Sequence, residues 1–484
     1  MSLLIPGTNS IKDTGYEVAN SLRFNDDSSD YLERGLTATG NQKKWTWSAW
    51  VKVSKTGAGD RFLWSTNNSD AGGGNFTSIQ LEADAFRFYN YSGGAFENQI
   101  TTNRKLRDSS AWYHLMVVYD SANSTADDRI KMYVNGVQET SFSTRTNPSL
   151  NQNSYVENTY DMYIGSQTGT ESYFDGYMTE VVFVNDATLD PTSFGEFDSD
   201  TNIWKPINVS GLTFGNNGFY LDFENSSSLG ADVSGNGNNF TVNNLTSIDQ
   251  TTDTCTNNFC TLMSNTPSAA NFTLSEGNLV ASKSGATTIG LYGSSIMLTS
   301  GKWYYESKIT DLGSGDRSRM GVAAYESVTG TSSIQGSYSG FEFTGTTSGR
   351  FSITVNGTTT EIDGFNSYAQ GDIIMWAIDM DNTKLYIGKN GDWFNYSSAN
   401  TGGDPTSGSG WVTNDATALA APLTVGYVGH ASGISDSTEV KINFGNPPYA
   451  ISSGNSDANG YGNFEYAVPS GYYAINSKNL AEYG

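Results

Sequence analysis

Paired carboxylates are the residues of this sequence whose spacing comes closest to catalysis. A retaining glycoside hydrolase needs two carboxyl groups about 5 Å apart, which a strand supplies from positions i and i+2 on one face. Glu361-Ile-Asp363 has this spacing, but the hydrolase pattern needs a further acid about two residues on, where the chain has Gly364-Phe-Asn366. Asp379-Met-Asp381 and Glu82-Ala-Asp84 also lack a third partner. Because 50 acids produce such pairs by composition, we interpret all three as solvated strand ends.

Histidine is the second residue type that could do acid–base chemistry, and the chain has only two. His114 lies in a strand-like segment between Tyr113 and Leu115, and His430 lies in a segment without a nucleophile elbow nearby. A serine triad needs such a base beside a reactive serine and an acid. We therefore predict no catalytic residue and expect the chain not to be an enzyme.

Metal binding has few candidate ligands. Cys255 and Cys260 are the only cysteines, too few for a four-cysteine zinc site. They form either two free thiols, which we favour, or a local disulfide. Calcium prefers oxygen ligands, and its candidates are Asp26-Asp27, Asp127-Asp128 and Asp198-Ser-Asp200. None has the spacing of a defined calcium loop, so we predict no metal or cofactor and keep calcium as the alternative.

Sugar recognition would use aromatic rings with amide or carboxylate side chains beside them. Phe88-Tyr-Asn-Tyr91, with Asn75 nearby in the sequence, is a candidate platform. Alternation of core residues along a strand explains the same segment equally well. No single ligand-binding residue is therefore assigned from the sequence.

Charge excludes two classes of partner. The chain has 26 basic and 50 acidic residues, a formal net charge of −24. Binding to nucleic acid or to an anionic membrane begins with lysines and arginines, so neither partner is expected. No stretch approaches the ~18 apolar residues of a membrane helix, and the first residues, Met1 to Gly7, lack the basic region of a secretory signal. A protein of this kind acting outside cells would be released by lysis or within a particle.

The elements that position these residues are predicted to be strands. Aromatics make up 13% of the chain and 53 residues are glycine, which favours β-structure with many tight turns. Trp45 to Val53 alternates so that Trp45, Trp47 and Ala49 share one face. Asn135-Gly136 predicts a hairpin over 129–142. Further strands are expected at 112–119, 303–309, 351–355, 373–378 and 383–387.

This pattern predicts an all-β chain of two antiparallel sandwiches of the jelly-roll type in tandem. The expected parts are an N-terminal arm (1–19), a first sandwich (20–205), an irregular segment that wraps along a neighbour (206–285), a second sandwich (286–450) and a C-terminal tail (451–484). Hydrophobic residues such as Phe219 and Phe240 recur within 206–285, and a flexible linker would waste them.

Two ordered sets of motifs resemble known families. The first half contains Asn20-Ser-Leu-Arg-Phe24, Trp45-Thr-Trp-Ser-Ala-Trp-Val51, Trp112-Tyr-His-Leu115, Tyr133-Val-Asn-Gly136 and Phe174-Asp-Gly-Tyr-Met178. This set resembles laminin-G-like, concanavalin A-like domains of tailed-phage proteins. The second half contains Ser300-Gly-Lys-Trp-Tyr-Tyr-Glu306, Gly321-Val-Ala323, Gly371-Asp-Ile-Ile374, Leu385-Tyr-Ile-Gly-Lys-Asn-Gly391 and Val440-Lys-Ile-Asn-Phe-Gly445. That set resembles SPRY domains, in which the Asn-Gly turn and the Asn-Phe-Gly strand are architectural.

The resemblance implies a non-enzymatic protein on the surface of a marine, cyanophage-type virion, assembled in the host cytoplasm. Such a protein would be a tail-fibre or host-recognition component or a head decoration. Its expected partners are host surface glycans and other virion proteins of the capsid or tail, and we expect a homo-oligomer. Two rivals remain: a purely architectural decoration protein of the capsid or fibre, and, ranked last, a polysaccharide depolymerase acting through Glu361 and Asp363.

Overall fold

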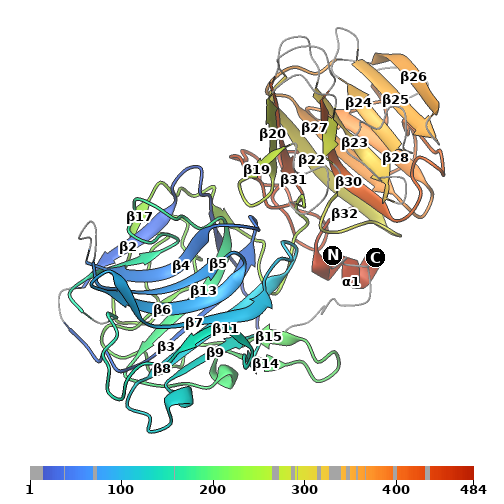
Figure 1. Cartoon of the computed structure of the whole chain (residues 1–484). Coiled ribbons are helices and arrows are strands. Elements are labelled where there is room, and N and C mark those ends of the chain that lie inside the picture. Colours follow the sequence, from blue (N-terminus) through green and yellow to red (C-terminus); the bar gives the residue numbers. More distant parts are fainter. Residues whose placement is uncertain are drawn as a thin grey trace. The chain divides into compact units, whose positions relative to one another are not determined.

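The computed structural model describes residues 15–484 except 37–38, 69–73, 157, 264–271, 285–288, 292, 313–317, 326–339, 345–348, 356–357, 366, 396–400 and 431–436. The chain forms two compact units that divide after Thr256 (Figure 1). Each consists of antiparallel sheets, which confirms the all-β prediction. Among the described residues, no helix is both long and apolar enough to cross a membrane.

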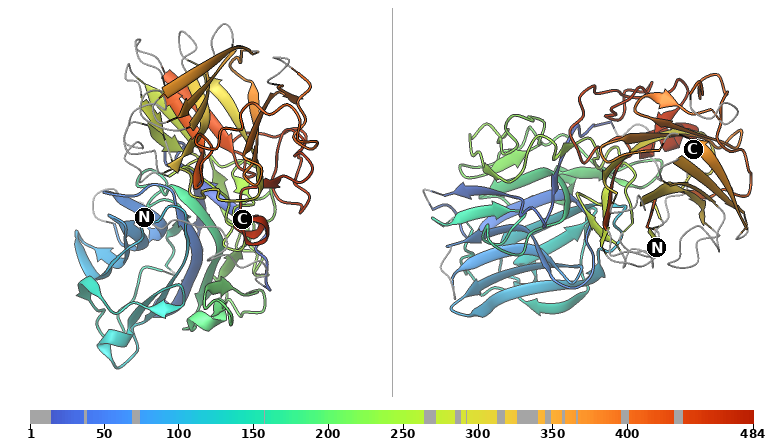
Figure 2. Two further views of the ribbon diagram at one scale, coloured as in Figure 1. Left: turned by 90° about the vertical axis from the view of Figure 1, so that its right-hand side faces the viewer. Right: turned by 90° about the horizontal axis from the view of Figure 1, so that it is seen from above.

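The first unit is a sandwich of two eight-stranded sheets, visible as stacked layers in Figure 2. The β3 sheet runs in the order β10 (Val137–Gln138), β9 (Ile130–Val134), β8 (Trp112–Asp120), β3 (Lys44–Val53), β13 (Gly176–Asn185), β1 (Ser21–Phe24) and β18 (Gln250–Thr251), with β16 (Phe219–Leu221) also paired to β13. The β6 sheet runs β11 (Phe142–Thr146), β7 (Ala95–Lys105), β6 (Ala85–Ser92), β5 (Phe76–Glu82), β4 (Asp60–Asn67), β12 (Asp161–Ile164), β2 (Tyr31–Gly35) and β17 (Thr241–Asn243). The hairpin of β14 (Gly195–Phe197) and β15 (Trp204–Pro206) and two 3-10 turns, Ala126–Asp128 and Pro191–Ser193, complete it.

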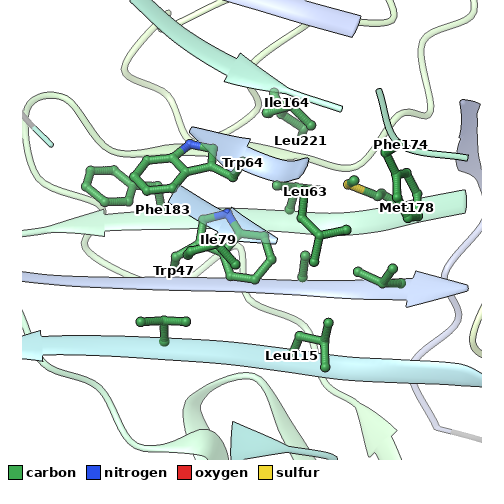
Figure 3. Close-up of a cluster of buried hydrophobic side chains, with 14 of the residues drawn as sticks. Trp47, Leu63, Trp64, Ile79, Leu115, Ile164, Phe174, Met178, Phe183 and Leu221 are labelled. Atoms are coloured by element: carbon green, nitrogen blue, oxygen red, sulfur yellow. The ribbon is translucent and has the colours of Figure 1, made fainter. Parts of the chain in front are cut away.

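Aromatic residues fill the space between these two sheets. Trp45, Trp47 and Ala49 point into the core, as their alternation along β3 predicts. Trp45 stacks on Tyr119 with ring centroids 5.4 Å apart, and Figure 3 shows Trp47 beside Trp64. Offset and tilted aromatic contacts add to simple burial, so β3 is held firmly at the centre of its sheet.

The predicted hairpin after β9 is confirmed. Asn135 and Gly136 have φ angles of +51° and +74°, the left-handed pair that a two-residue turn of type I′ requires. The returning strand β10 has only two residues, so the paired part of the hairpin is shorter than the predicted 129–142.

The segment after β15 is ordered within the first unit. β16, β17 and β18 pair with β13, β2 and β1, and Asp232 ties the intervening loop together. Its carboxylate accepts hydrogen bonds from the backbone N–H groups of Tyr220 (3.0 Å), Ser234 (2.9 Å) and Asn238 (2.7 Å). The boundary after Thr256 therefore falls inside the 206–285 segment that we expected to join the sandwiches.

The second unit is also a sandwich. The β22 sheet runs β19 (Thr273–Ser275), β20 (Val280–Ser284), β31 (Ser437–Asn443), β22 (Lys302–Asp311), β27 (Ile373–Asp379), β28 (Lys384–Lys389) and β29 (Asp392–Trp393), with β32 (Tyr473–Ala474) parallel to β22. The β23 sheet runs β21 (Ile289–Leu291), β30 (Leu423–His430), β23 (Ser318–Ala324), β24 (Gly340–Thr344), β25 (Gly349–Val355) and β26 (Thr358–Phe365). A short helix, α1 (Ser477–Tyr483), follows β32.

The C-terminal tail covers the outer face of the β22 sheet. Buried Glu306 on β22 accepts hydrogen bonds from the backbone N–H groups of Glu465 (3.0 Å) and Tyr466 (2.8 Å). Phe464 packs edge-on against Tyr304 with ring centroids 5.0 Å apart. A buried carboxylate is tolerated only when such donors satisfy it, so Glu306 fixes where the tail lies.

Candidate functional site

The predicted sugar platform on β6 is divided by the pleat of the strand. Phe88 is fully buried in the core of the sandwich, and Asn90 is buried with its side chain hydrogen-bonded to Asn98 (3.1 Å). Tyr89 and Tyr91 alternate with them and face the opposite, outer side. Only these two residues of the predicted platform therefore belong to the outer face.

Phe76 and Phe96 complete an aromatic group on this outer face, which we call the outer aromatic patch (Phe76, Tyr89, Tyr91 and Phe96). Strand pairing places Phe76 and Phe96 on either side of Tyr91. The ring centroids of Phe76 and Tyr91 are 4.8 Å apart, and Phe96 meets Tyr91 edge-on at 5.3 Å. Phe96 is 45% exposed although it is a large apolar residue. The patch is thus pre-packed and still accessible.

Arg87 lies beneath the patch. Its guanidinium carbon is 4.7 Å from the ring centroid of Tyr89 and 4.6 Å from that of Phe96. Its two terminal nitrogens donate to Glu82 (2.6 Å) and Gln99 (2.7 Å). Cation–π contact and charge-assisted hydrogen bonds hold both rings in place, so the patch keeps its shape without a ligand.

Polar residues from the ends of these strands and from the segment before β12 border the patch, and we call them the polar rim (Asn75, Ser92, Glu97, Tyr155 and Tyr160). The Ser92 hydroxyl donates to Asn75 (2.6 Å), and the Asn75 amide lies 3.5 Å from the Tyr160 hydroxyl. The rings of Tyr155 and Tyr160 stack at 6.4 Å. Burial, and then the adjacent Glu97 carboxylate, raise the pKa of Tyr155, so its hydroxyl stays protonated at neutral pH and keeps its donor capacity.

Patch and rim together can bind a ligand that has both an apolar face and many hydroxyl groups. Asn75, Ser92 and Glu97 directly follow or precede patch residues in the sequence, which makes the two surfaces continuous. Sequence reasoning missed Phe76, Phe96, Tyr155 and Tyr160. The Gly93-Gly94 pair was the available signal, because it forms the two-residue turn that aligns Tyr91 with Phe96.

The two histidines do not form a catalytic group in the described residues. His114 Nε2 is 2.8 Å from the Ser48 hydroxyl, a contact that the sequence did not predict. Both side chains are buried, and His114 Nδ1 has no hydrogen-bond partner, so the acid of a triad is missing. Burial lowers the pKa of His114 to about 3, which makes it a poor base near neutral pH. The side chain of His430 lies outside the described residues.

Two of the acid pairs have structural partners. Asp84 stands in a tight turn with φ +68° and pairs with Arg61 (2.7 Å) and Arg107 (2.9 Å), while Glu82 pairs with Arg87. Asp379 is buried, where it pairs with Lys302 at 3.0 Å.

The third pair, Glu361 and Asp363, lies on the edge strand β26 of the second unit. Glu361 is exposed, and the side chain of Asp363 lies outside the described residues. The structure therefore brings no second described carboxylate to Glu361.

One acid pair on the outer face of the β6 sheet was not anticipated. Glu33 on β2 is paired with Tyr163 on β12, and Asp161 lies two residues before Tyr163 on the same strand. Partial burial, and then the Asp161 charge, raise the pKa of Glu33. The two residues are 128 positions apart in the sequence, so only the pairing of β2 with β12 brings them together.

The calcium candidates are engaged with cationic or amide groups. Asp26 forms an ion pair with Lys55, and Asp127 accepts a hydrogen bond from the Asn147 amide (2.6 Å). Asp198 accepts from the backbone N–H of Thr201 (2.9 Å). In the part of the chain that the structure describes, no three histidine, cysteine or acidic side chains are grouped to hold a metal.

Asp26 has a neighbour that the sequence did not reveal. Asp175 is buried beside it, and burial, and then the Asp26 charge, hold the pKa of Asp175 well above its usual range. The two cysteines, Cys255 and Cys260, are both free thiols, the alternative that the sequence analysis favours.

Residues 26–191 match the family model described as the concanavalin A-like lectin/glucanases superfamily. The first unit thus contains a laminin-G-like, concanavalin A-like domain, as its motifs predict. No curated protein matches the chain.

Several solved structures are similar to this chain. The mouse laminin α1 domains LG4-5 are 8% identical, with 91% of this chain and 89% of that chain covered and a TM-score of 0.29. The SPRY domain of human HERC1 is 19% identical, with 34% and 87% covered and a TM-score of 0.25. A Bacteroides ovatus protein assigned as carbohydrate-binding is 16% identical, with 47% and 59% covered and a TM-score of 0.34. The chain thus spans less than two thirds of that protein.

Proposed function

We propose that this chain is a non-enzymatic protein of a bacteriophage surface, a tail-fibre or host-recognition component or a head decoration, that binds host glycans or neighbouring virion proteins. The observation that carries the glycan-binding part is the outer aromatic patch beside the polar rim. Phe96 stays 45% exposed there at the end of a packed row of rings. Aromatic rings bordered by amides and hydroxyls give a sugar both stacking surface and hydrogen-bond partners.

The family description supports sugar recognition and includes both lectins and glucanases. The described residues favour the lectin alternative, because the patch itself carries no pair of acids positioned on a reacting bond. The virion location is also a proposal, and it is supported by the order of the motifs in the two halves of the chain.

A binding experiment with the full chain tests this function. The wild-type protein is expected to bind host envelope polysaccharide or members of a glycan array, and Phe96→Ala to weaken that binding by about tenfold, equivalent to about 1.4 kcal/mol. Phe197→Ala is the matched control, because Phe197 is 46% exposed in the same unit but lies on β14. Equal binding by wild type and Phe96→Ala would remove the patch from the proposal.

The rival architectural function makes a different prediction. A decoration protein whose partners are the capsid or another fibre chain would leave adsorption to the host unchanged when it is deleted, and the particle would become less stable. Reduced adsorption by otherwise stable particles would favour host recognition instead.

The rival depolymerase function is best tested at Glu33 and Asp161, which the pairing of β2 with β12 brings together, and no longer at Glu361. We expect the wild type to release no reducing sugar from host polysaccharide. Release that Glu33→Gln abolishes would establish the enzyme.

A further inference from the structure

We infer that the outer aromatic patch and polar rim take a neutral, hydroxyl-rich oligosaccharide and discriminate against acidic glycans. The inference rests on the proposed function, because it names the class of sugar that the same site would bind. It follows from how the charges of the site are arranged.

Among the described residues of the site, Arg87 is the one cation, and its guanidinium already has partners within the protein. Arg87 donates from one terminal nitrogen to Glu82 and from the other to Gln99, and its side chain is 8% exposed. The rings of Tyr89 and Phe96 lie against it. A sugar carboxylate or sulfate would need a free, forked guanidinium or an ammonium group, and Arg87 offers neither.

The remaining charge of the site is negative. Glu97 is exposed on a β-bulge between the patch and the rim, where the Gln152 amide donates to it at 3.2 Å. An anionic sugar would thus approach like charge, which costs binding energy with nothing to offset it.

The uncharged groups of the site suit a neutral sugar. The hydroxyls of Ser92, Tyr155 and Tyr160 both donate and accept, and the Asn75 amide does both as well. The row from Phe76 on β5 to Phe96 on β7 crosses three strands, which at the usual strand spacing is about 10 Å. That length exceeds a single pyranose ring, so we infer that an oligosaccharide segment binds and not only a terminal residue.

Matched ligands test the inference. With the full chain, titration calorimetry compares lactose-based oligosaccharides and neutral hexose polymers with α2,3-sialyllactose and uronic acid polymers. We expect the neutral members to bind at least about tenfold more tightly. Their affinity should change by less than about twofold between about 50 and about 500 mM salt, because no ion pair forms.

Charge-reversed variants sharpen the test. Glu97→Lys is expected to bring the acidic glycans to within about twofold of the neutral ones. Asp200→Lys, the same charge change at an exposed residue far along the chain in the same unit, should leave the preference unchanged.

The outcomes separate the two claims. Tighter binding of acidic glycans by the wild type, or an affinity that falls steeply with salt, overturns the inference and leaves glycan binding standing. A preference for amino sugars overturns it too, because Glu97 would then be binding a cation. Binding to no glycan of either class removes the glycan-binding part of the proposed function together with the inference.

Discussion

The two outer faces of the first sandwich carry similar aromatic residues, but the rings are buried on one face and partly exposed on the other. On the β3 sheet, Trp50, Trp112, Tyr177 and Trp204 form a cluster in which every member is at most 9% exposed. On the β6 sheet, Phe96 stays 45% exposed at the rim of the patch. Residue type alone therefore does not make a binding surface.

The difference comes from what the chain lays over each face. The segment after β13 returns across the β3 sheet, where Val209, Phe214 and Tyr220 pack on it. Asp253 is anchored there by Lys52 (2.7 Å) and by the indole N–H of Trp112 (3.1 Å). Within the described residues, no such segment covers the patch on strands β5 to β7, so the aromatic rings that stabilise one face remain available for a ligand on the other.

The largest effect on stability is expected from breaking the buried ion pair between Lys52 and Asp253 on the covered face. Lys52 and Asp253 are at most 1% exposed, so Asp253→Ala removes the carboxylate that faces a buried ammonium group. Lys52 keeps its contact with the Tyr177 ring, 5.5 Å from Nζ to the centroid, but loses its carboxylate partner. We expect the free energy of unfolding to fall by up to about 3–5 kcal/mol, and the double variant Lys52→Met, Asp253→Leu to recover most of it. Urea denaturation followed by tryptophan fluorescence measures both.

An exposed ion pair provides the control for the buried pair of Lys52 and Asp253. Lys55 is 55% exposed where it pairs with Asp26, so Lys55→Met should cost less than about 1 kcal/mol. Similar losses from Asp253→Ala and Lys55→Met would mean that the covered face is not held by its buried pair.

A smaller, pH-dependent effect is expected at Glu180, also on the covered face. Burial raises its pKa to about 8, and Tyr220 donates to it at 2.8 and 2.9 Å. The folded state therefore holds a proton that the unfolded chain, with a pKa near 4.5, releases. The contribution of Glu180 to the free energy of unfolding is fully present below pH 4.5. It is lost as the pH rises to about 8, and the loss is on the order of a few kcal/mol.

The variant Glu180→Gln isolates this contribution. The amide keeps the size of the side chain and cannot ionise, so the stability of the variant should not show this fall between pH 5 and pH 8. Parallel curves for wild type and variant across this range would contradict a protonated Glu180.

Local sequence patterns predict much of this fold and little of the site. Alternation in Trp45 to Val53 gives the core face of β3, and Asn135-Gly136 gives its turn, because both depend on neighbouring residues alone. The patch depends on pairing between strands. Tyr91 is aligned with Phe76 and Phe96 by two successive hairpins, and a single strand pattern does not show which of its faces the chain later covers.

The polar contacts are harder still, because their partners are distant in sequence. Lys52 and Asp253 are 201 positions apart, and Ser48 and His114 are 66 apart. Burial determines what such residues do: His114 has a lowered pKa and no acid at Nδ1. The sequence set His114 aside because it lies in a strand-like segment, and the structure adds a physical reason, because desolvation lowers its pKa.

Of two aromatic substitutions, the one at the open face is expected to cost less stability, and it completes the comparison. Phe96 is already 45% exposed, so Phe96→Ala removes only part of the buried area that a core ring loses and should lower the free energy of unfolding by about 1–2 kcal/mol. Trp50→Ala on the covered face, where Trp50 is 4% exposed, should cost about 3–5 kcal/mol. If Phe96→Ala were as destabilising as Trp50→Ala, the patch would be a structural cluster and its exposed ring would need no ligand to explain it.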